Sequence, residues 1–443
     1  MNPTTLQHLH DAIGGQLCPA VGAAPNGADV VLGPIATDSR QVEPGQVFWG
    51  LVGPNHNGAD YTDEAFSRGA SGAVVGKEVE APPDRWVLQV PNSQAALWQW
   101  AAWRRSQFAG TVIAVTGSVG KTTTRQMIHA VLGSRLQGTA SPRNYNNQIG
   151  VPLSMSAMEP DHDYAVLELG ASSPGEIASL ARLCAPKVGV ITQVGDAHLG
   201  GFGSRSGIAE AKAELLAALP EEGRAVLGDD PWIRSVAQKS KAPITWVGRD
   251  ASCELMAEQV KSRQGRLTFR LGGQDFIVPV WGRHHLTAAL IAVAVGRMMG
   301  LDLREIANAL AGFQPLPMRC EVREIRGATI INDCYNANPT AMEAAMELLR
   351  DFDAPGRRIV VCGDMAELGD EAERLHLRLG TQIVTLCGAD LVIACGRYAR
   401  HVVTGARAAG MPHTRAIPCR TPEETLPYLG QVILPGDMVL VKG

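Results

Sequence analysis

The sequence predicts an α/β protein of three domains, and three observations lead to this prediction. A chain of 443 residues corresponds to roughly three domains at about 150 residues each. From residue 109 to about 315, short apolar runs alternate with helical stretches, which is the pattern of a parallel sheet with helices on both faces. The stretch FQPLPMR at 313–319, with two prolines, is a candidate linker to a further set of apolar runs. We therefore predict domains over residues 1–108, 109–315 and 316–443.

Each range contains runs that are typical of strands. Residues 1–108 are rich in Gly, Pro and Asn and contain GAVV at 72–75 and RWVLQV at 85–90, which indicates a small α/β unit. The central range contains TVIAV, YAVLELG, KVGVITQV and RAVLG, and RLTFRLGGQDFIVPV at 266–280 predicts a small antiparallel hairpin that turns at Gly272-Gly273. In the last range, four runs end in polar or glycine residues, as strands of a Rossmann-like sheet do: ATIIN, RRIVVCG, DLVIACG and DMVLVKG.

Composition excludes several classes of partner. Forty basic residues stand against forty-four acidic ones, and no basic run is dense enough to neutralise nucleic acid or an anionic membrane surface. The longest apolar run, AALIAVAVG at 288–296, is too short to span a bilayer, and the N-terminus lacks a signal-peptide pattern. The nine cysteines are odd in number and contain no Cys-x-x-Cys pair, so we predict reduced packing residues in a cytoplasmic protein.

The segment VIAVTGSVGKTTT, residues 112–124, predicts a phosphate-binding loop. Val115 stands where the Walker pattern has its first glycine, but a short apolar strand precedes the loop and a helix can follow it. Gly117, Ser118 and Gly120 allow backbone N–H groups to face an anion, Lys121 supplies positive charge, and Thr122 supplies a hydroxyl for a metal. The alternative is a plain glycine turn before a helix that happens to contain a lysine.

Three later residues are candidate ligands for the divalent cation that accompanies a nucleotide triphosphate. Glu168 ends the apolar run DYAVLELG, although a single acid there can equally be a solvated surface residue. His198 follows the next apolar run in a glycine-rich loop, where a histidine is more often structural. Lys212 lies between acids on a predicted helix, and its local sequence alone favours a solvated, salt-bridged lysine.

Together these segments resemble the Mur ligases, the ATP-dependent amide-forming enzymes of peptidoglycan precursor synthesis. TGSVGKTTT, LELG, ITQVGDAHL and AKAE match the central ATPase domain of that family in order and spacing. TDSRQVEPGQVFWGLVG at 37–53 is similar to its uridine-nucleotide domain, and INDCYNANPTAM at 331–342 is similar to a segment of its C-terminal domain. The resemblance covers essentially the whole chain and implies three domains: a UDP-precursor-binding domain, a central ATPase-like domain and a Rossmann-like C-terminal domain.

Within the family, four segments resemble members that add D-alanyl-D-alanine to UDP-N-acetylmuramoyl-tripeptide: RNYNNQIGVPLS, LGASSPGEI, YNANP and GDMAELG. The Asp-Asn-Pro-Arg signature of members that add the third, diamino residue is absent. The resemblance therefore implies that ATP phosphorylates the tripeptide carboxyl and that the dipeptide amine attacks the acyl phosphate. It also implies ATP and Mg²⁺ as cofactors, the two peptide substrates as partners, and we expect a monomer.

The resemblance implies a role for each of several residues. Lys121, His198 and Lys212 are expected to be catalytic, with Lys212 carbamylated, and Thr122, Glu168, His198 and Lys212 are expected to organise metal ions. The residues expected to bind ATP are Gly117, Ser118, Val119, Gly120, Lys121, Thr122, Thr123, His285, Arg319, Asp333, Tyr335 and Asn336. Those expected to bind the UDP-precursor or the dipeptide are Ser39, Arg40, Asn146, Asn147, Ser172 and Asp364.

The sequence also departs from the family pattern. His285 and Ala288 stand where members often have asparagines, one of them near adenine, and Met318 replaces a glycine before the linker arginine. The family usually continues beyond Val-Lys-Gly with a final helix, so we expect a trimmed chain or one that lacks this element. Two other hypotheses stay open: a nucleotide-binding regulator or scaffold of the same fold, and a relative that ligates glutamate to folate. The latter would not explain the uridine-type segment or GDMAELG.

Overall fold

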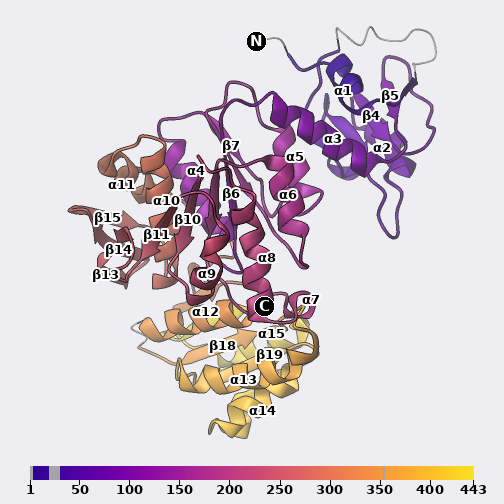
Figure 1. Cartoon of the computed structure of the whole chain (residues 1–443). Coiled ribbons are helices and arrows are strands. Elements are labelled where there is room, and N and C mark those ends of the chain that lie inside the picture. The colour runs from indigo at the N-terminus through magenta and orange to yellow at the C-terminus, as the bar shows by residue number, and fades with distance from the viewer. Residues whose placement is uncertain (1–2, 19–29, 353–354) are drawn as a thin grey trace. The chain divides into compact units, whose positions relative to one another are not determined.

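The computed structural model describes residues 3–18, 30–352 and 355–443, which form two compact units (Figure 1). The first unit is made from the ranges 1–112, 137–169 and 179–185, and the second from 113–136, 170–178 and 186–443. The architecture is α/β with several largely parallel sheets, as predicted. The three domain ranges proposed from the sequence stay predictions.

The first unit contains a five-stranded sheet in the order β1-β5-β4-β3-β2. Its strands are β1 (Gln16–Cys18), β2 (Ile35–Ala36), β3 (Val47–Gly50), β4 (Gly72–Val75) and β5 (Trp86–Gln89). All neighbours are parallel except β1, which pairs with β5 in antiparallel orientation. The strands predicted at 72–75 and 85–90 are therefore confirmed as β4 and β5.

Alternation along these strands gives the sheet two buried faces, because successive side chains of a strand point to opposite sides. Trp49 and Val74 belong to a cluster with residues of α1 (Leu6–Ile13) and α3 (Ser93–Ser106). Phe48 belongs to a second cluster with residues of α2 (Thr62–Ser67).

The rest of the first unit carries Glu168. The strands β7 (Gly138–Ala140) and β8 (Tyr164–Glu168) pair in parallel, and α5 (Gly150–Ser156) packs against α3. Every residue of β8 is buried, which agrees with its apolar sequence. Glu168 is thus delivered to the carboxyl end of a buried strand, as the sequence predicted.

The second unit contains a parallel sheet with the order β12-β11-β10-β9-β6. Its strands are β6 (Thr111–Thr116), which belongs to this unit from Ile113 onward, β9 (Val188–Ile191), β10 (Arg224–Gly228), β11 (Ile244–Gly248) and β12 (Leu255–Met256). Among its helices, α10 (Leu286–Met298) contacts β10, β11 and α4 (Lys121–Leu132). Because the strands are parallel, the segments that follow β6 and β9 leave the sheet at the same edge.

A small antiparallel sheet confirms the predicted hairpin. It contains β13 (Glu258–Arg263), β14 (Arg266–Leu271) and β15 (Gln274–Val278). Gly272 and Gly273 connect β14 to β15 with φ values of 56° and 81°, the left-handed backbone that favours glycine in a two-residue turn. The sequence did not predict β13. The other helices of the second unit up to residue 311 are α7 (Leu199–Phe202), α8 (Arg205–Ala217), α9 (Pro231–Val236) and α11 (Leu303–Ala311), whereas α6 (Glu176–Cys184) is divided between the two units and lies mostly in the first.

The second unit ends with a six-stranded sheet in the order β16-β17-β21-β18-β19-β20. Its strands are β16 (Glu321–Ile325), β17 (Ala328–Asn332), β18 (Arg358–Cys362), β19 (Leu391–Cys395), β20 (Ala416–Cys419) and β21 (Met438–Lys442). The four predicted strands of this region are confirmed as β17, β18, β19 and β21. The edge strand β16, which the sequence did not predict, is antiparallel to β17.

Helices cover both faces of this sheet (Figure 1). Val360 of β18 packs in a cluster with residues of α12 (Pro339–Asp351), α13 (Ala372–Thr385) and α14 (Ala399–Ala408). The flanking Ile359 and Val361 point to the other face, where residues of α15 (Pro422–Val432) contribute. This arrangement is a doubly wound sheet.

Two expectations from composition can be compared with the described residues. All nine cysteines are free and most are buried, so most of them pack in the interior; their reduced state stays a prediction. In the described ranges, no helix has both the length and the apolar character needed to cross a bilayer.

Candidate active site

The predicted phosphate loop connects the end of β6 to the first turn of α4. Val115 is fully buried in β6, so the strand continues through the position at which the Walker pattern has its first glycine. Gly117 and Gly120 have φ values of 145° and 83°. A Cβ atom at Gly117 would lie 2.0 Å from Thr192 Oγ1, so both backbone conformation and space require glycine there.

The segment after β9 fixes this loop in place. The Ser118 N–H donates to the Gln193 carbonyl at 2.7 Å, and Ser118 Oγ donates to the Gly195 carbonyl at 3.0 Å. Thr192 Oγ1 donates to the Val119 carbonyl at 2.5 Å. These contacts hold the turn in a conformation that brings it to the N-terminus of α4.

Charge and helix orientation make this loop suitable for an anion. Gly120 is the N-cap of α4, and Lys121, Thr122 and Thr123 form the first turn, whose N–H groups lack carbonyl partners within the helix. Lys121 Nζ donates to the Gly117 carbonyl at 2.8 Å, so the ammonium group lies across the loop. Positive charge and the positive end of a helix dipole therefore coincide at one point.

Lys212 is buried, which contradicts the solvated lysine that its local sequence favours. Its side chain lies on α8 at 2% exposure, with Nζ 5.4 Å from the centre of the Phe202 ring. Burial, reinforced by the charge of Lys121, lowers the pKa of Lys212 to about 7. An amine with this pKa is a substantially neutral nucleophile near pH 7, which an exposed lysine is not.

His198 lies close to both lysines. It is the N-cap of α7 with a φ of 56°, and its Nδ1 contacts the Glu367 carboxylate. Burial, together with the positive charges of Lys121 and Lys212, lowers the pKa of His198 to about 4. A neutral imidazole that donates from Nδ1 to a carboxylate keeps its Nε2 lone pair for another ligand.

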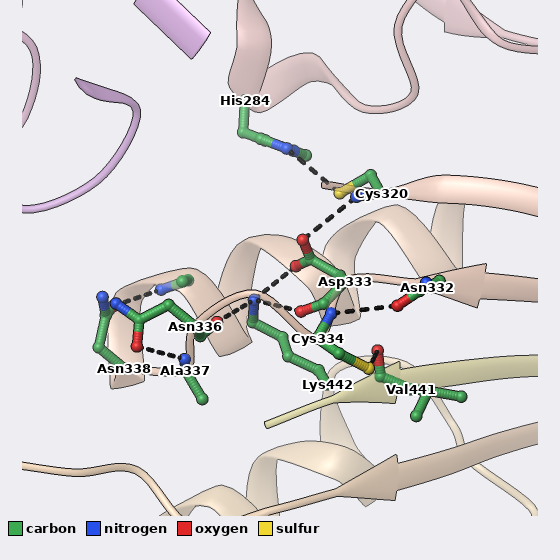
Figure 2. A network of polar contacts seen from close by, with 11 residues as sticks. His284, Cys320, Asn332, Asp333, Cys334, Asn336, Ala337, Asn338, Val441 and Lys442 are labelled. Atoms are coloured by element: carbon green, nitrogen blue, oxygen red, sulfur yellow. Dashed lines mark hydrogen bonds and ion pairs between the residues drawn. The ribbon is translucent and has the colours of Figure 1, made fainter. Parts of the chain in front are cut away.

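A second group of predicted ATP-binding residues also comes together in this unit. Arg319 Nη2 lies 3.5 Å from Thr122 Oγ1, and its guanidinium group lies 3.9 Å from the centre of the Tyr335 ring. Lys442 pairs with the Asp333 carboxylate and donates to the Asn336 carbonyl at 2.9 Å (Figure 2). The loop between β17 and α12 is thereby tied to the end of β21.

His285 lies near this group. Burial lowers the pKa of His285 well below its ordinary value, and the neighbouring His284 and the charge of Arg319 lower it further. His285 forms the end of the short turn before α10. The imidazole is therefore neutral where the family pattern has an amide.

The first unit holds the predicted residues Glu168, Asn146 and Asn147. Glu168 is 1% exposed, and Asn146 Nδ2 donates to its Oε1 at 2.9 Å. Asn147 instead accepts from the N–H groups of Ile149 and Gly150 and so shapes the start of α5. Asn146 thus has a direct contact with a candidate metal ligand, and Asn147 has a local structural contact.

Ser39 and Arg40 lie in a short turn of the first unit. Ser39 Oγ donates to Glu64 Oε2 at 2.5 Å. Arg40 is 76% exposed and forms a two-point ion pair with Asp38, which lowers the pKa of that carboxyl group to about 2. An exposed guanidinium held in a fixed fork is available to a diphosphate that displaces Asp38.

The remaining predicted residues, Ser172 and Asp364, have contacts in the second unit. The Ser172 N–H donates to Glu176 Oε2 at 2.8 Å, and its carbonyl packs so closely on Gly201 that a Cβ atom there would lie 1.9 Å away. Asp364 accepts from the N–H groups of Arg397 and Tyr398 at 2.7 and 3.0 Å. Asp364 therefore organises the turn before α14.

Sequence reasoning did not single out three charged residues. Glu367 contacts His198, Glu176 influences the charge state of both His198 and Lys212, and Lys442 pairs with Asp333. Glu367 belongs to the segment GDMAELG, which carried part of the family resemblance, but no role was assigned to its glutamate. Glu176 lies in LGASSPGEI and Lys442 in DMVLVKG, and neither side chain was assigned a role in these segments.

The chemistry of the donors agrees with a hard divalent cation such as Mg²⁺. In the second unit, the buried hydroxyl of Thr122 lies beside Lys121, and in the first unit Glu168 offers a buried carboxylate. Hydroxyl and carboxylate oxygens are the ligands that Mg²⁺ prefers, with water completing its coordination.

Comparisons with known proteins were made by sequence and by structure. The sequence model described as Mur ligase middle domain matches residues 115–296, and the one described as Mur ligase, glutamate ligase domain matches residues 318–443. The chain is similar to the UDP-N-acetylmuramoyl-tripeptide--D-alanyl-D-alanine ligase of Bacillus subtilis, with 34% identity over 91% of this chain and 87% of the relative. It is also 34% identical to the Escherichia coli protein of the same name, over 93% of this chain and 89% of that protein.

The chain is also similar to solved structures of the same kind of ligase. A crystal structure of MurF from Acinetobacter baumannii superposes with a TM-score of 0.87 at 31% identity, covering 100% of this chain and 96% of the other. The MurF ligase of Thermotoga maritima in complex with ADP has a TM-score of 0.77 at 29% identity, covering 93% of each chain.

Proposed function

This chain belongs to the Mur ligase family, and on that premise we propose that it adds D-alanyl-D-alanine to UDP-N-acetylmuramoyl-tripeptide in an ATP-dependent reaction. The product is the UDP-N-acetylmuramoyl-pentapeptide of peptidoglycan synthesis. The observation that carries the proposal is the phosphate loop, with Lys121 at the N-terminus of α4 and with His198 and the buried Lys212 close by.

A carboxylate resists attack by an amine, so the reaction needs activation. The tripeptide carboxylate oxygen bonds to the γ-phosphorus of ATP, and the bond between that phosphorus and the β-γ bridging oxygen breaks, which releases ADP. The neutral dipeptide amine then attacks the acyl-phosphate carbonyl carbon to form a tetrahedral intermediate. Collapse expels inorganic phosphate, and the amine proton passes to solvent.

The charged residues of the second unit have roles that match this chemistry. Lys121 holds the phosphoryl group while its negative charge moves, which is the main task of a protein in phosphoryl transfer. Arg319, stacked on Tyr335 and beside Thr122, is suited to the same phosphates. Asp333 and Asn336 take the roles expected from the family, and the contacts of Lys442 keep their loop in place.

The metal site is part of the proposal. Mg²⁺, when bound, neutralises phosphate charge and orients the reacting oxygens. In the second unit, Thr122 would supply an oxygen ligand, and His198, held through Nδ1 by Glu367, would offer Nε2 to a second ion. Glu168 of the first unit is the carboxylate that the family resemblance adds as a ligand. Lys212 takes part as a carbamate, because its lowered pKa makes the neutral amine available to carbon dioxide.

The cellular compartment and the oligomeric state are also part of the proposal. Nine free cysteines agree with a reducing compartment, so we assign the reaction to the cytoplasm. We further propose that the enzyme acts as a monomer.

The test is a mass-spectrometric assay of the amide product with a panel of UDP-muramoyl-peptides and dipeptides. The expected result is pentapeptide product, with phosphate release that requires both the tripeptide precursor and D-alanyl-D-alanine. Lys121→Ala should abolish product while the far-ultraviolet circular dichroism stays that of the wild type. Phosphate release with folate and glutamate, or nucleotide binding without any ligation, would instead support one of the two other hypotheses.

A further inference from the structure

His284, His285 and Cys320 bring their side-chain donor atoms together. In the part of the chain that the structure describes, this is the one group of three His, Cys, Asp or Glu residues whose potential ligand atoms all lie within 4.8 Å of one another. Cys320 Sγ lies 3.8 Å from His284 Nε2, and Figure 2 shows the His284 ring directed toward the sulfur. The two imidazole rings have centroids 4.0 Å apart.

The backbone holds these side chains where they are. Gly282 has a φ of 101°, and a Cβ atom there would lie 2.4 Å from Cε1 of His284, so the ring rests directly on the glycine. Cys320 has a φ of 52°, a strained value for a residue with a side chain, and its N–H donates to Asp333 Oδ1 at 3.2 Å. The sulfur and the imidazoles are therefore presented by restrained segments.

Two nitrogen donors and one sulfur donor suit a borderline transition-metal ion and do not suit Mg²⁺. In a tetrahedral zinc site, a nitrogen and a sulfur bound to the same ion are about 3.6 Å apart. The 3.8 Å separation of Cys320 Sγ and His284 Nε2 is close to this value. A hydrogen bond from the thiol to His284 would give a similar distance, but it does not need the third donor atom that His285 places within 4.8 Å of the other two.

The three side chains differ in burial, and the Cys320 thiol must lose a proton to bind an ion. Cys320 is buried, whereas His285 is half-buried and His284 is exposed, so an ion can reach the group from solvent through His284. Burial raises the pKa of the Cys320 thiol. An ion would therefore displace the thiol proton, and binding would be weaker at low pH.

We propose that His284, His285 and Cys320 form a binding site for a divalent transition-metal ion of the Zn²⁺ class. The ion accepts lone pairs from the two neutral imidazoles and from the Cys320 thiolate, the thiol proton passes to solvent, and no oxidation or reduction takes place. Water takes the fourth position. Because His284 and His285 precede α10 while Cys320 precedes β16, the bound ion links these two segments.

One consequence rests on the proposed function. His285 and Arg319 are proposed to bind ATP, and Arg319 is adjacent to Cys320 in the sequence. An ion at this site therefore occupies space at the nucleotide, and Zn²⁺ should act as an inhibitor that competes with ATP.

Metal binding is tested first, without nucleotide, on the full chain after treatment with a chelator. Titration with Co²⁺ alone should give a thiolate-to-cobalt charge-transfer band that saturates at one equivalent and is removed by Zn²⁺. Cys320→Ser should abolish the band, and both Cys320→Ser and His284→Gln should weaken Zn²⁺ binding on the order of 100-fold, as loss of a ligand does. Cys395→Ser and His413→Gln, which lie outside the group, should leave both properties unchanged.

A measurement on the unmodified chain avoids the effects of substitution on folding. Zn²⁺ should protect Cys320 from alkylation by iodoacetamide, with mass spectrometry reporting each of the nine cysteines separately. Absence of a charge-transfer band at saturating Co²⁺, or equal alkylation of Cys320 with and without Zn²⁺, would overturn the site.

Competition with ATP is tested separately, by the dependence of Zn²⁺ inhibition on ATP concentration in wild type and Cys320→Ser. Since the Co²⁺ titration contains no nucleotide, a failure of the metal site is distinguishable from a failure of the ligase assignment.

Discussion

Burial gives Lys212 a chemistry that its local sequence does not indicate. A lysine between acids on a helix is normally solvated and cationic, whereas this one lies at 2% exposure beside Phe202. Its pKa of about 7 reflects burial first and the charge of Lys121 second. The environment therefore makes the neutral amine available for the proposed reaction with carbon dioxide, which would convert it into an anionic carbamate and release one proton.

We predict that the carbamate of Lys212 depends on pH in a definite direction. Above about pH 7 the amine is neutral and reacts, and below it the amine is protonated and does not. The carbamate signal in ¹³C NMR with labelled bicarbonate should therefore grow as the pH rises from about 6 to 8. A signal that is absent or that falls over this range would contradict the assignment.

Chemical rescue provides a second prediction at the same residue. If Lys212 is a carbamate as proposed, Lys212→Ala should be nearly inactive because it lacks the negative charge of that group, and formate or acetate should restore part of the activity. The surface variant Lys239→Ala is the control and should keep wild-type turnover. Rescue by alkylamines would show that the positive charge of the lysine matters, and the carbamate assignment would then be wrong.

Glu367 acts on the site through His198. Its carboxylate holds Nδ1, so it orients the ring and leaves Nε2 available to the proposed metal ion. We predict that Glu367→Ala raises the Mg²⁺ concentration needed for half-maximal activity about 10- to 100-fold. Glu367→Gln, which keeps an oxygen acceptor, should recover most of this loss, and an unchanged Mg²⁺ requirement in Glu367→Ala would exclude the positioning role.

At the scale of elements, the phosphate site depends on how β6, α4 and the segment after β9 meet. The loop uses two glycines with positive φ, and Ser118 and Thr192 tie it to the neighbouring chain. Val115 can replace the usual first glycine because that position lies inside the strand. The phosphate-binding geometry thus comes from the turn and the helix N-terminus and does not need the full sequence pattern.

We predict that Gly117→Ala disrupts this loop. The added Cβ would meet Thr192 Oγ1 at 2.0 Å, and moving that hydroxyl would break its bond to Val119. A displacement of about 1 Å at such a site costs on the order of 100-fold in kcat/KM.

The matched control is Gly388→Ala. Gly388 also has a positive φ, of 61°, but an added Cβ there meets nothing within 4 Å. This variant should lose only about 1 kcal/mol of stability and keep wild-type kinetics. Equal kinetic losses in the two variants would show that backbone strain, and not the contact with Thr192, is responsible.

At the scale of the whole molecule, the predicted uridine-side and phosphate-side residues lie in different compact units. Ser39 and Arg40 belong to the first unit, whereas Lys121 and Arg319 belong to the second. Arg40 lies at the surface, and its guanidinium group donates two hydrogen bonds to the Asp38 carboxylate. Binding of the two nucleotides should therefore be separable by substitution.

We predict that Arg40→Ala weakens binding of the UDP-precursor by about 10- to 100-fold, which corresponds to hydrogen bonds to a charged group of about 1.5–3 kcal/mol. Calorimetry should show that ADP binding is unchanged. Arg420→Ala, another exposed arginine paired with an acid, is the control and should affect neither ligand. Equal losses for both nucleotides in Arg40→Ala would count against separate binding regions.

The sequence by itself determined the features that depend on near neighbours along the chain. The turn at Gly272-Gly273, the strand before the phosphate loop and the helix after it were predicted correctly, because hydrophobic period and glycine conformation act over a few residues. The family resemblance implied the ligase chemistry, and it could be recognised from the sequence because each of its motifs is a short contiguous segment.

Only the tertiary structure decided which distant side chains meet. His198 and Glu367 are 169 residues apart in the sequence, and Thr122 and Arg319 are 197 apart. The burial that lowers the pKa of Lys212 is likewise absent from its local sequence, AKAE. The physical reason is that desolvation and contacts across elements are properties of the packed molecule, since they depend on what surrounds a side chain in space and not on its neighbours in the chain.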